Sequence, residues 1–155
     1  MNISDILRHK GSGVLAIAAD DTVIDLLRTL AEHNVGAMVV RAGETGDNSD
    51  NSDNSDNSDM LGIVSERDVV RRIAERGPAV LDATVGEIMT SEVLSCTSKD
   101  SVDSVGQTMT ARRIRHMPVI DDGALVGIVS IGDVVLSRIR QLEIDRGQLE
   151  QYISS

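Results

Sequence analysis

The sequence predicts an α/β (α+β) chain of two tandem units, each with the order strand, helix, strand, strand, helix. Three observations lead to this prediction: an internal repeat, a change of apolar spacing within each repeat, and an aliphatic composition. Of the 155 residues 41% are hydrophobic, yet Trp and Phe are absent and Tyr occurs once. The core must therefore be aliphatic. An aromatic platform for stacking single-stranded nucleic acid is excluded.

The repeat covers most of the chain. Residues 14–17 match 93–96 and residues 35–40 match 114–119, both at an offset of 79, whereas residues 62–70 match 127–135 at an offset of 65. The drop of 14 indicates a 14-residue insertion in the first copy.

The start of each copy is also repeated, because Ile3–Leu7 resembles Val85–Met89. This similarity places the boundary near Gly77 and Pro78. The predicted division of the chain is a first repeat over 1–77 with a low-complexity loop at 43–59, a second repeat over 78–140, and a helical tail over 141–155.

Within the first copy, the β-rich run at 14–17 predicts a strand. A helix follows, with Thr22 as N-cap, Asp25 three residues later and Asn34 as its end. Strands are predicted at 37–40 and 60–64, and Ser65 begins a second helix. The residues expected to face the core are Val23, Leu26, Leu27, Leu30 and Ala31 on the first helix, and Val69, Val70, Ile73 and Ala74 on the second.

The inserted segment repeats Asp-Asn-Ser four times and ends at Asp59. Such a polar tract buries nothing, so a solvated, mobile loop is expected. Its five Asp residues at a spacing of three raise the alternative of a calcium-responsive protein. The tract lacks the turn Gly and the closing Glu of the helix-loop-helix calcium site, so the loop interpretation is favoured.

Charge and apolar content exclude several classes of partner. Lys and Arg number 15 against 25 Asp and Glu, a formal charge of −10, which disfavours nucleic acid and anionic lipid. No apolar run approaches the roughly 20 residues of a membrane span, and the N-terminus lacks the regions of a signal peptide. We expect a cytoplasmic protein without membrane contact.

The strongest chemical motif is Gly-Ile-Val-Ser-x-x-Asp, present at 62–68 and again at 127–133. Its simplest interpretation is a helix capping box, in which Ser65 and Ser130 cap and Asp68 and Asp133 complete the box. The same groups suit a ribonucleotide. A carboxylate held at a helix start accepts both hydroxyls of a ribose, while the Ser hydroxyl and free backbone amides face a phosphate.

Basic residues near the motifs support an anionic ligand. Arg67 in the first helical turn opposes the helix dipole, so we expect an anion there, with pairing to Glu66 or Asp68 as the alternative. Gly132 replaces it in the second copy, so the two sites should differ. Arg115 and His116 enter a strand and could reach a phosphate.

Catalysis and metal binding are not expected. His9, His33 and His116 lie on three different predicted elements, and no Ser has a His in a context that suggests a nucleophile and base. Cys96, the only cysteine, matches Ile17 in the repeat, so a core position is favoured over a zinc ligand.

The tandem units, both Gly-Ile-Val-Ser-x-x-Asp motifs and the Arg115–Val119 strand resemble a cystathionine-β-synthase (CBS) domain pair, especially small stand-alone bacterial members with a C-terminal helix like 141–153. The resemblance implies β-α-β-β-α repeats about a pseudo-twofold axis, flat dimers, and adenine-nucleotide sites in the cleft between the repeats. AMP, ATP or NAD(H) would bind without any obligatory cofactor.

Carried over by position, the resemblance implies that the motif Asp holds the ribose, that the motif Ser lies at the phosphate, and that the preceding strand flanks the adenine. Val39 stands where the family often has proline, which weakens the adenine wall of site one. The implied residues are Thr22, Gly36, Ala37, Met38, Ser65, Arg67 and Asp68 in site one, and Ser101, Arg115, His116, Met117, Pro118, Ser130, Gly132 and Asp133 in site two.

Two functions are weighed. The first is a regulatory sensor whose bound adenine nucleotide changes the surface that an unknown protein effector reads. The second is a ligand-free dimerisation or interaction module. The apolar run Val134, Val135, Leu136, Ile139, Leu142, Leu149 and Ile153 predicts a long last helix whose unpartnered part contacts a second subunit, with packing on the first repeat as the alternative.

Overall fold

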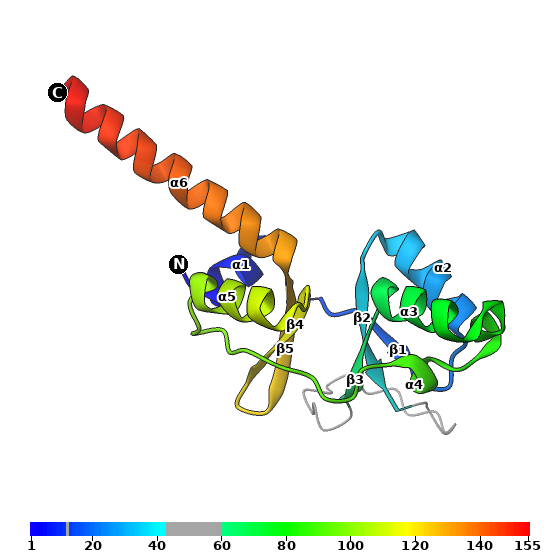
Figure 1. Ribbon diagram of the computed structural model, residues 1–155. Coiled ribbons are helices and arrows are strands. Elements are labelled where there is room, and N and C mark those ends of the chain that lie inside the picture. Colours follow the sequence, from blue (N-terminus) through cyan, green and yellow to red (C-terminus); the bar gives the residue numbers. More distant parts are fainter. Residues whose placement is uncertain (12, 43–59) are drawn as a thin grey trace. The chain divides into compact units, whose positions relative to one another are not determined.

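A computed structural model describes residues 1–11, 13–42 and 60–155 (Figure 1). The expected 43–59 loop and its calcium alternative lie outside these residues. The elements, in chain order, are α1 (Ile3–Lys10), β1 (Ala16–Ala18), α2 (Val23–His33), β2 (Ala37–Arg41), β3 (Met60–Ser65), α3 (Glu66–Arg76), the 3-10 helix η2 (Pro78–Asp82), α4 (Val85–Ile88), α5 (Val102–Arg112), β4 (His116–Asp121), β5 (Ala124–Ser130) and α6 (Ile131–Ser154).

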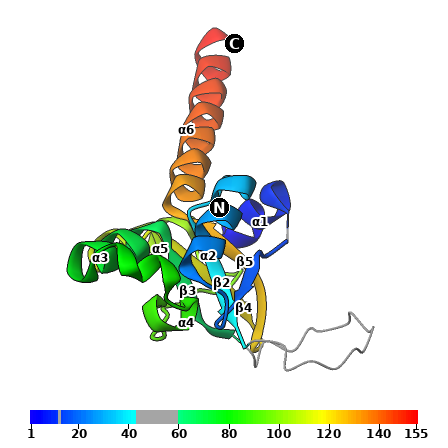
Figure 2. The same ribbon diagram turned by 90° about the vertical axis from the view of Figure 1, so that its right-hand side faces the viewer.

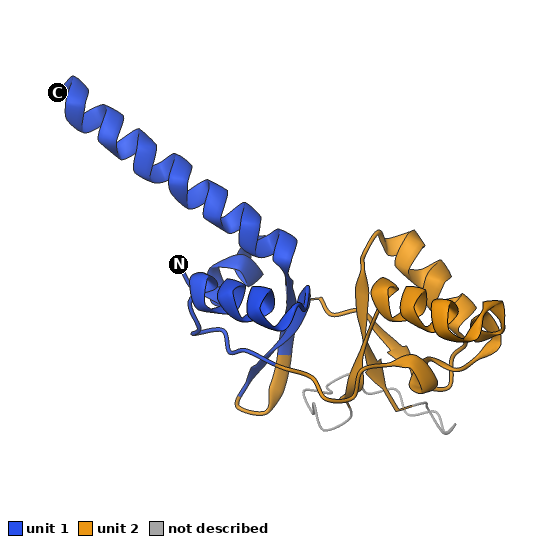
Figure 3. Ribbon diagram, viewed as in Figure 1, with its two compact units in different colours: residues 1–12, 95–121, 126–155 blue, residues 13–94, 122–125 orange. Residues whose placement is uncertain are grey.

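The chain divides into two compact units, coloured separately in Figure 3. Unit 1 contains residues 1–12, 95–121 and 126–155, and unit 2 contains residues 13–94 and 122–125. Compact units and sequence repeats are thus different divisions of the chain. The element that opens each repeat packs in the other repeat's unit: α1 lies in unit 1, and α4 lies in unit 2. The repeat boundaries at 77 and 140 remain a prediction.

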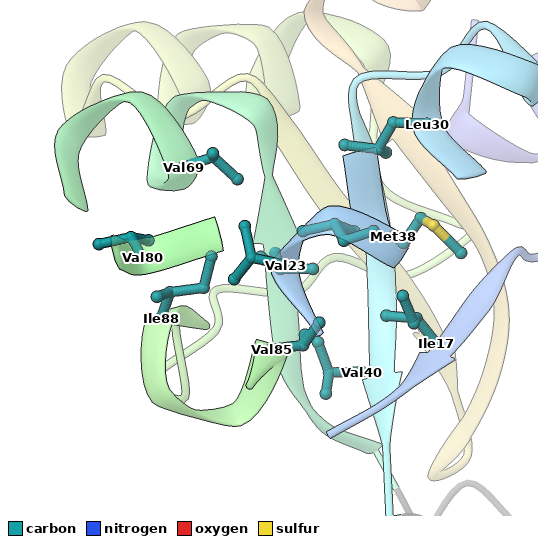
Figure 4. Close-up of a cluster of buried hydrophobic side chains, with 11 residues drawn as sticks. Ile17, Val23, Leu30, Met38, Val40, Val69, Val80, Val85 and Ile88 are labelled. Atoms are coloured by element: carbon teal, nitrogen blue, oxygen red, sulfur yellow. The ribbon is translucent and has the colours of Figure 1, made fainter. Parts of the chain in front are cut away.

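Unit 2 is built on a three-stranded sheet of order β1-β2-β3. The central strand β2 pairs in parallel with β1 and antiparallel with β3, where Ala37 lies opposite Ser65. Figure 4 shows how Met38 and Val40 from β2 meet side chains of α2 and α4 in the buried core. All core residues of this unit are aliphatic, as the composition predicts.

Unit 1 combines the two-stranded sheet β4-β5 with α1, α5 and α6. Its buried cluster includes Ile3 from α1, Met109 from α5, Val119 from β4 and Val134 from α6. Ile3 is fully buried, and its N–H donates to the carbonyl of Asp100 at 2.9 Å. The N-terminal helix is therefore an integral part of this core.

The strand predicted at 93–96 forms only a single parallel bridge, between Cys96 and Val119. Two differences in the second copy account for this. The N–H of Ser98, whose counterpart Ala19 donates to the carbonyl of Arg41, donates instead to Asp121 Oδ1 at 2.9 Å, and Pro118 removes a second ladder bond. In the first repeat, the N–H of Val39 donates to the carbonyl of Leu15 at 3.2 Å. Pro118 stands at the position equivalent to Val39 and has no N–H to donate, so the second copy lacks this ladder bond.

The predicted helix ends are confirmed. Thr22 caps α2, whose last residue is followed by Asn34 in the left-handed conformation, and Ser65 and Ser130 cap α3 and α6. The sequence analysis assigned too many residues to the buried faces of α2 and α3. Val70 is 67% exposed, and Ala31 and Ala74 are exposed as well. Both helices pack on the sheet through a narrower stripe, such as Val69 and Ile73 on α3.

The motif glycines allow a close approach of other segments. At Gly62 an added Cβ would collide with the backbone carbonyl of Thr90. Thr90 pairs with β3 there. Its N–H donates to the carbonyl of Ile63 at 2.9 Å, and its carbonyl accepts from the N–H of Ile63 at 3.0 Å. At Gly127 the same Cβ would meet the side-chain end of Leu7 at 2.6 Å. The need for glycine thus comes from packing by α1 and the segment after α4.

We predict that Gly62→Ala destabilises the protein more than Gly127→Ala. The backbone of Thr90 cannot move without breaking its bridge, so overpacking there should cost about 2 kcal/mol. The flexible Leu7 can rotate away, so the second change should cost under about 1 kcal/mol. Urea unfolding of the two variants provides the comparison, and equal losses would contradict the packing explanation.

Candidate functional site

Both motifs fold into the same capping box at a junction between strand and helix. In unit 2, the N–H of Ser65 donates to Asp68 Oδ2 at 2.9 Å, and the N–H of Asp68 donates to Ser65 Oγ at 3.3 Å. In unit 1, the matching bonds between Ser130 and Asp133 measure 2.9 and 3.1 Å. The capping interpretation of the motif is therefore confirmed, and each carboxylate is held rigidly at a helix start.

The residue that leads into the neighbouring strand, β2 or β4, is hydrogen-bonded to the same helix. The N–H of Glu66 donates to the carbonyl of Gly36 at 3.0 Å, and the N–H of Ile131 donates to the carbonyl of Arg115 at 2.8 Å. Each unit thereby brings its predicted strand residues next to its motif. Gly36 and Arg115 occupy equivalent positions, so unit 1 carries a charged side chain where unit 2 carries none.

Four more of the predicted residues are placed by their burial or by their capping role. Met38 and Met117 are 1% and 2% exposed, and both belong to hydrophobic cores, so only their backbone can face a ligand. Thr22 and Ser101 cap α2 and α5. Within the described residues, no hydrogen bond or ion pair joins either cap to a motif aspartate. Their place in a site stays a prediction.

An ion pair distinguishes the unit 1 motif. Lys10, the last residue of α1, donates from Nζ to Asp133 Oδ2 at 2.8 Å and to the carbonyl of Ile128 at 3.0 Å. The Asp133 side chain is 23% exposed. Sequence reasoning missed Lys10, because its partner lies more than a hundred residues away. Extending the match between Ile3–Leu7 and Val85–Met89 sets Lys10 against Glu92, a reversal of charge.

The unit 2 motif aspartate accepts from two hydroxyl groups. Asp68 accepts from Ser65 Oγ at 3.1 Å and, at the longer distance of 3.4 Å, from Thr90 Oγ1. Thr90 was also not predicted as a site residue. The two motif aspartates therefore share their capping geometry, and each also accepts from a more distant segment, Asp133 from the Lys10 ammonium and Asp68 from the Thr90 hydroxyl.

The electrostatics of Asp133 follow from these contacts. Burial acts to raise the pKa of this carboxyl, but the Lys10 hydrogen bond, the Ser130 backbone amide and the Lys10 charge together hold it below its ordinary value of 3.8. A cavity of about 210 Å³ adjoins the pair. Its lining, all from unit 1, includes His9, Ser137 and Arg140. This hollow could admit a small polar group beside the ion pair.

We predict that Lys10→Met lowers the free energy of unfolding at pH 7 by up to about 1 kcal/mol. Because Asp133 has a depressed pKa when folded, its contribution is present above pH 3.8 and is lost as the pH falls through the folded pKa. The difference from wild type should therefore close in acid. Urea titrations across pH measure it. Arg76→Met, which removes an exposed cation from the last turn of α3, should show no such pH-dependent difference.

Cys96 is a core residue, as its match to Ile17 predicts, with 5% exposure. Burial, with a smaller effect of Asp100 and Asp121, raises the pKa of its thiol to about 11. In the described part of the chain, no three His, Cys, Asp or Glu side chains gather where they could hold a metal.

We expect Cys96 to resist thiol reagents at pH 8 in the folded protein, because the thiolate is the reactive species. Labelling should become fast once urea unfolds the chain. Mass spectrometry of the modified protein provides the measurement, and rapid labelling without denaturant would contradict a buried thiol.

Two capped strand-to-helix units with matching motifs define a tandem-repeat fold, and comparison with known proteins identifies its family. The family model of the CBS domain matches residues 3–75 and 85–139. The chain therefore belongs to the CBS-domain family, and its architecture is that of a CBS pair.

Relatives share this architecture over most of their length. The Arabidopsis thaliana protein called CBS domain-containing protein CBSX3, mitochondrial, is 37% identical over 97% of this chain and 71% of its own. The CBS-domain protein ATU1752 from Agrobacterium tumefaciens is 35% identical, with a TM-score of 0.76 over 88% of this chain and 92% of its own.

A second similar structure was solved with ligands. The CBS domain pair of MJ0100, in complex with 5′-methylthioadenosine and S-adenosyl-L-methionine, is 24% identical with a TM-score of 0.68, over 92% of this chain and 98% of its own. At this identity the likeness supports the fold. Among the described helices of the present chain, none combines the length and apolar character needed to cross a bilayer.

Proposed function

We propose that this protein is a non-catalytic regulatory module that binds an adenine nucleotide, AMP, ATP or NAD(H), at its motif aspartates. The observation that carries the proposal is the pair of rigid Ser and Asp junctions at Asp68 and Asp133. In each, one carboxylate oxygen is held by the capping amide, and the geometry keeps the acid at a helix start. This arrangement suits the two hydroxyls of a ribose and a nearby phosphate.

Two further facts support this ligand class. MJ0100, which shares the fold, was crystallised with two adenosine-containing compounds. The backbone of Gly36 and of Arg115, just before β2 and β4, is hydrogen-bonded to the motif helix, so it lies where a base could be flanked. Site one then consists of Thr22, Gly36, Ala37, Met38, Ser65, Arg67 and Asp68, and site two of Ser101, Arg115, His116, Met117, Pro118, Ser130, Gly132 and Asp133.

Binding would regulate by favouring one of two conformations, since a ligand shifts an equilibrium only through its different affinity for the two states. The proposed readers of that change are a second copy of the chain and a protein effector. A location in the cytoplasm stays a prediction, and the relative CBSX3 is named as mitochondrial.

The second candidate is a ligand-free interaction module. It is favoured by the intact capping boxes, because they already give Ser65, Asp68, Ser130 and Asp133 a structural role. It is also favoured by the long exposed apolar face of α6.

The test is thermal unfolding with AMP, ATP, NAD, NADH and S-adenosylmethionine at fixed salt and magnesium. A ligand at 100 times its dissociation constant should stabilise by roughly 2.7 kcal/mol. We predict that Asp68→Asn or Asp133→Asn retains folding, because the Asn oxygen still accepts the capping N–H, but reduces the ligand-induced shift by removing a charged ribose acceptor.

The matched control is Glu87→Gln, since Glu87 completes the capping box of α4 and lies outside the proposed sites. Its ligand-induced shift should equal that of wild type. The absence of a shift with all five compounds, in protein free of co-purified nucleotide, would favour the interaction module.

A further inference from the structure

The first helix of the chain brings a cation to the second motif. In Figures 1 and 2 alike, α1 lies beside the start of α6, the helix that carries Asp133. The Lys10 ammonium bonds Asp133 Oδ2 and the carbonyl of Ile128, and because an ammonium has three N–H donors, one is left for a ligand. The Ser130 N–H bonds the same oxygen, Oδ2. A ribose hydroxyl can therefore donate to Oδ1 without displacing the lysine.

Lys10 takes the place of a cation that the second motif itself lacks. The first motif has Arg67 directly before Asp68, whereas Gly132 stands before Asp133. A positive charge thus accompanies both motif aspartates, from the motif in unit 2 and from another helix in unit 1. The capping box needs no cation, since it joins only a Ser, an Asp and backbone amides. An anionic ligand explains this shared feature better than the cap does.

Helix α1 is anchored without the ion pair. Ile3 and Ile6 are 0% and 7% exposed and belong to the unit 1 core. The N–H of Ser4 donates to the carbonyl of Ser98 at 2.9 Å. These contacts hold the start of the helix, whereas Lys10 lies at its end with a side chain that is 42% exposed. An ion pair this open adds little to stability, so fixing α1 is not a sufficient reason for it.

The space beside the ion pair suits a phosphate group. The cavity of about 210 Å³ is lined by both partners of the pair and by Arg140, whose guanidinium makes no hydrogen bond or ion pair within the described residues. Asp5, also in the lining, accepts from the N–H of Asn2 at 2.9 Å and lies 3.4 Å from the Arg8 guanidinium. Both acids of the lining therefore already have a cationic partner. An anion that enters meets a net positive charge.

We propose that Lys10 makes the Asp133 site selective for phosphorylated adenine nucleotides, by cancelling the charge of Asp133 and donating to the phosphate of the ligand. The inference rests on the proposed function and names the ligand class of one of its sites. A phosphate monoester carries about −1.5 to −2 charges at neutral pH, and an uncompensated carboxylate beside it would repel it. With Lys10 in place, Asp133 still accepts a ribose hydroxyl, while the pair as a whole is neutral.

Calorimetric titration with AMP and ATP, and with adenosine as the compound without a phosphate, tests the proposal. The background is Asp68→Asn, which weakens the first site so that binding reports the second. There, Lys10→Met should raise the dissociation constants of AMP and ATP by about tenfold or more and change that of adenosine by less than about twofold. Lys10→Arg, which keeps the charge, should retain most of the affinity for AMP and ATP.

The matched control is Lys99→Met, which removes the other lysine of the chain from the same unit. Lys99 follows Ser98, whose N–H donates to Asp121 Oδ1 at the end of β4 away from Arg115. This variant should bind all three compounds as the background does. A second control combines Lys10→Met with Asp133→Asn, which leaves the first site. Its affinity for AMP should equal that of Asp133→Asn alone.

Equal weakening of AMP and adenosine by Lys10→Met would give the ion pair a structural role only, and an unchanged AMP affinity would give it no role in binding. Either result overturns the proposal and leaves the nucleotide function intact. A background protein that binds none of the compounds, when wild type binds AMP, would remove the Asp133 site. A wild type that binds neither AMP nor ATP would also overturn the proposal, and if NAD and NADH fail as well, the proposed function falls with it.

Discussion

The junction between the last strand of each repeat and the helix that follows is the constraint on which the structure depends. A helix start leaves backbone N–H groups without partners, and here a Ser and an Asp three residues later satisfy them within one turn. A further backbone bond ties the neighbouring strand to the helix, from Glu66 to Gly36 and from Ile131 to Arg115. Sheet, helix and carboxylate are thus fixed together by local contacts.

Local signals of this kind explain why so much of the fold could be predicted. Thr22, Asn34, Ser65 and Ser130 mark element ends through interactions with residues only a few positions away. Contacts between distant segments were harder to predict from the sequence. The shortened strand at Cys96 depends on Pro118 and Asp121 in another strand, and the exposure of Val70 depends on how narrow the packed face of α3 is. Neither follows from periodicity within one element.

In the candidate site, too, local patterns could be predicted and contacts between distant segments could not. Both capped aspartates could be found in the sequence, because the motif is short and occurs twice. Lys10 could not, since its bond to Asp133 joins the first helix to the last. Met38 and Met117 were assigned to a ligand from their position in the strand, whereas their side chains lie in the two cores. A strand residue has a backbone and a side chain that can serve different purposes.

The exchange of opening elements between the repeats limits how this protein can change. Since α1 completes the core of unit 1 and α4 that of unit 2, neither sequence repeat contains everything that its own sheet needs. A single repeat cut from the chain would expose the surface that its missing helix covers. The two repeats are therefore interdependent, so a change that removes one of them also removes a helix from the core of the other.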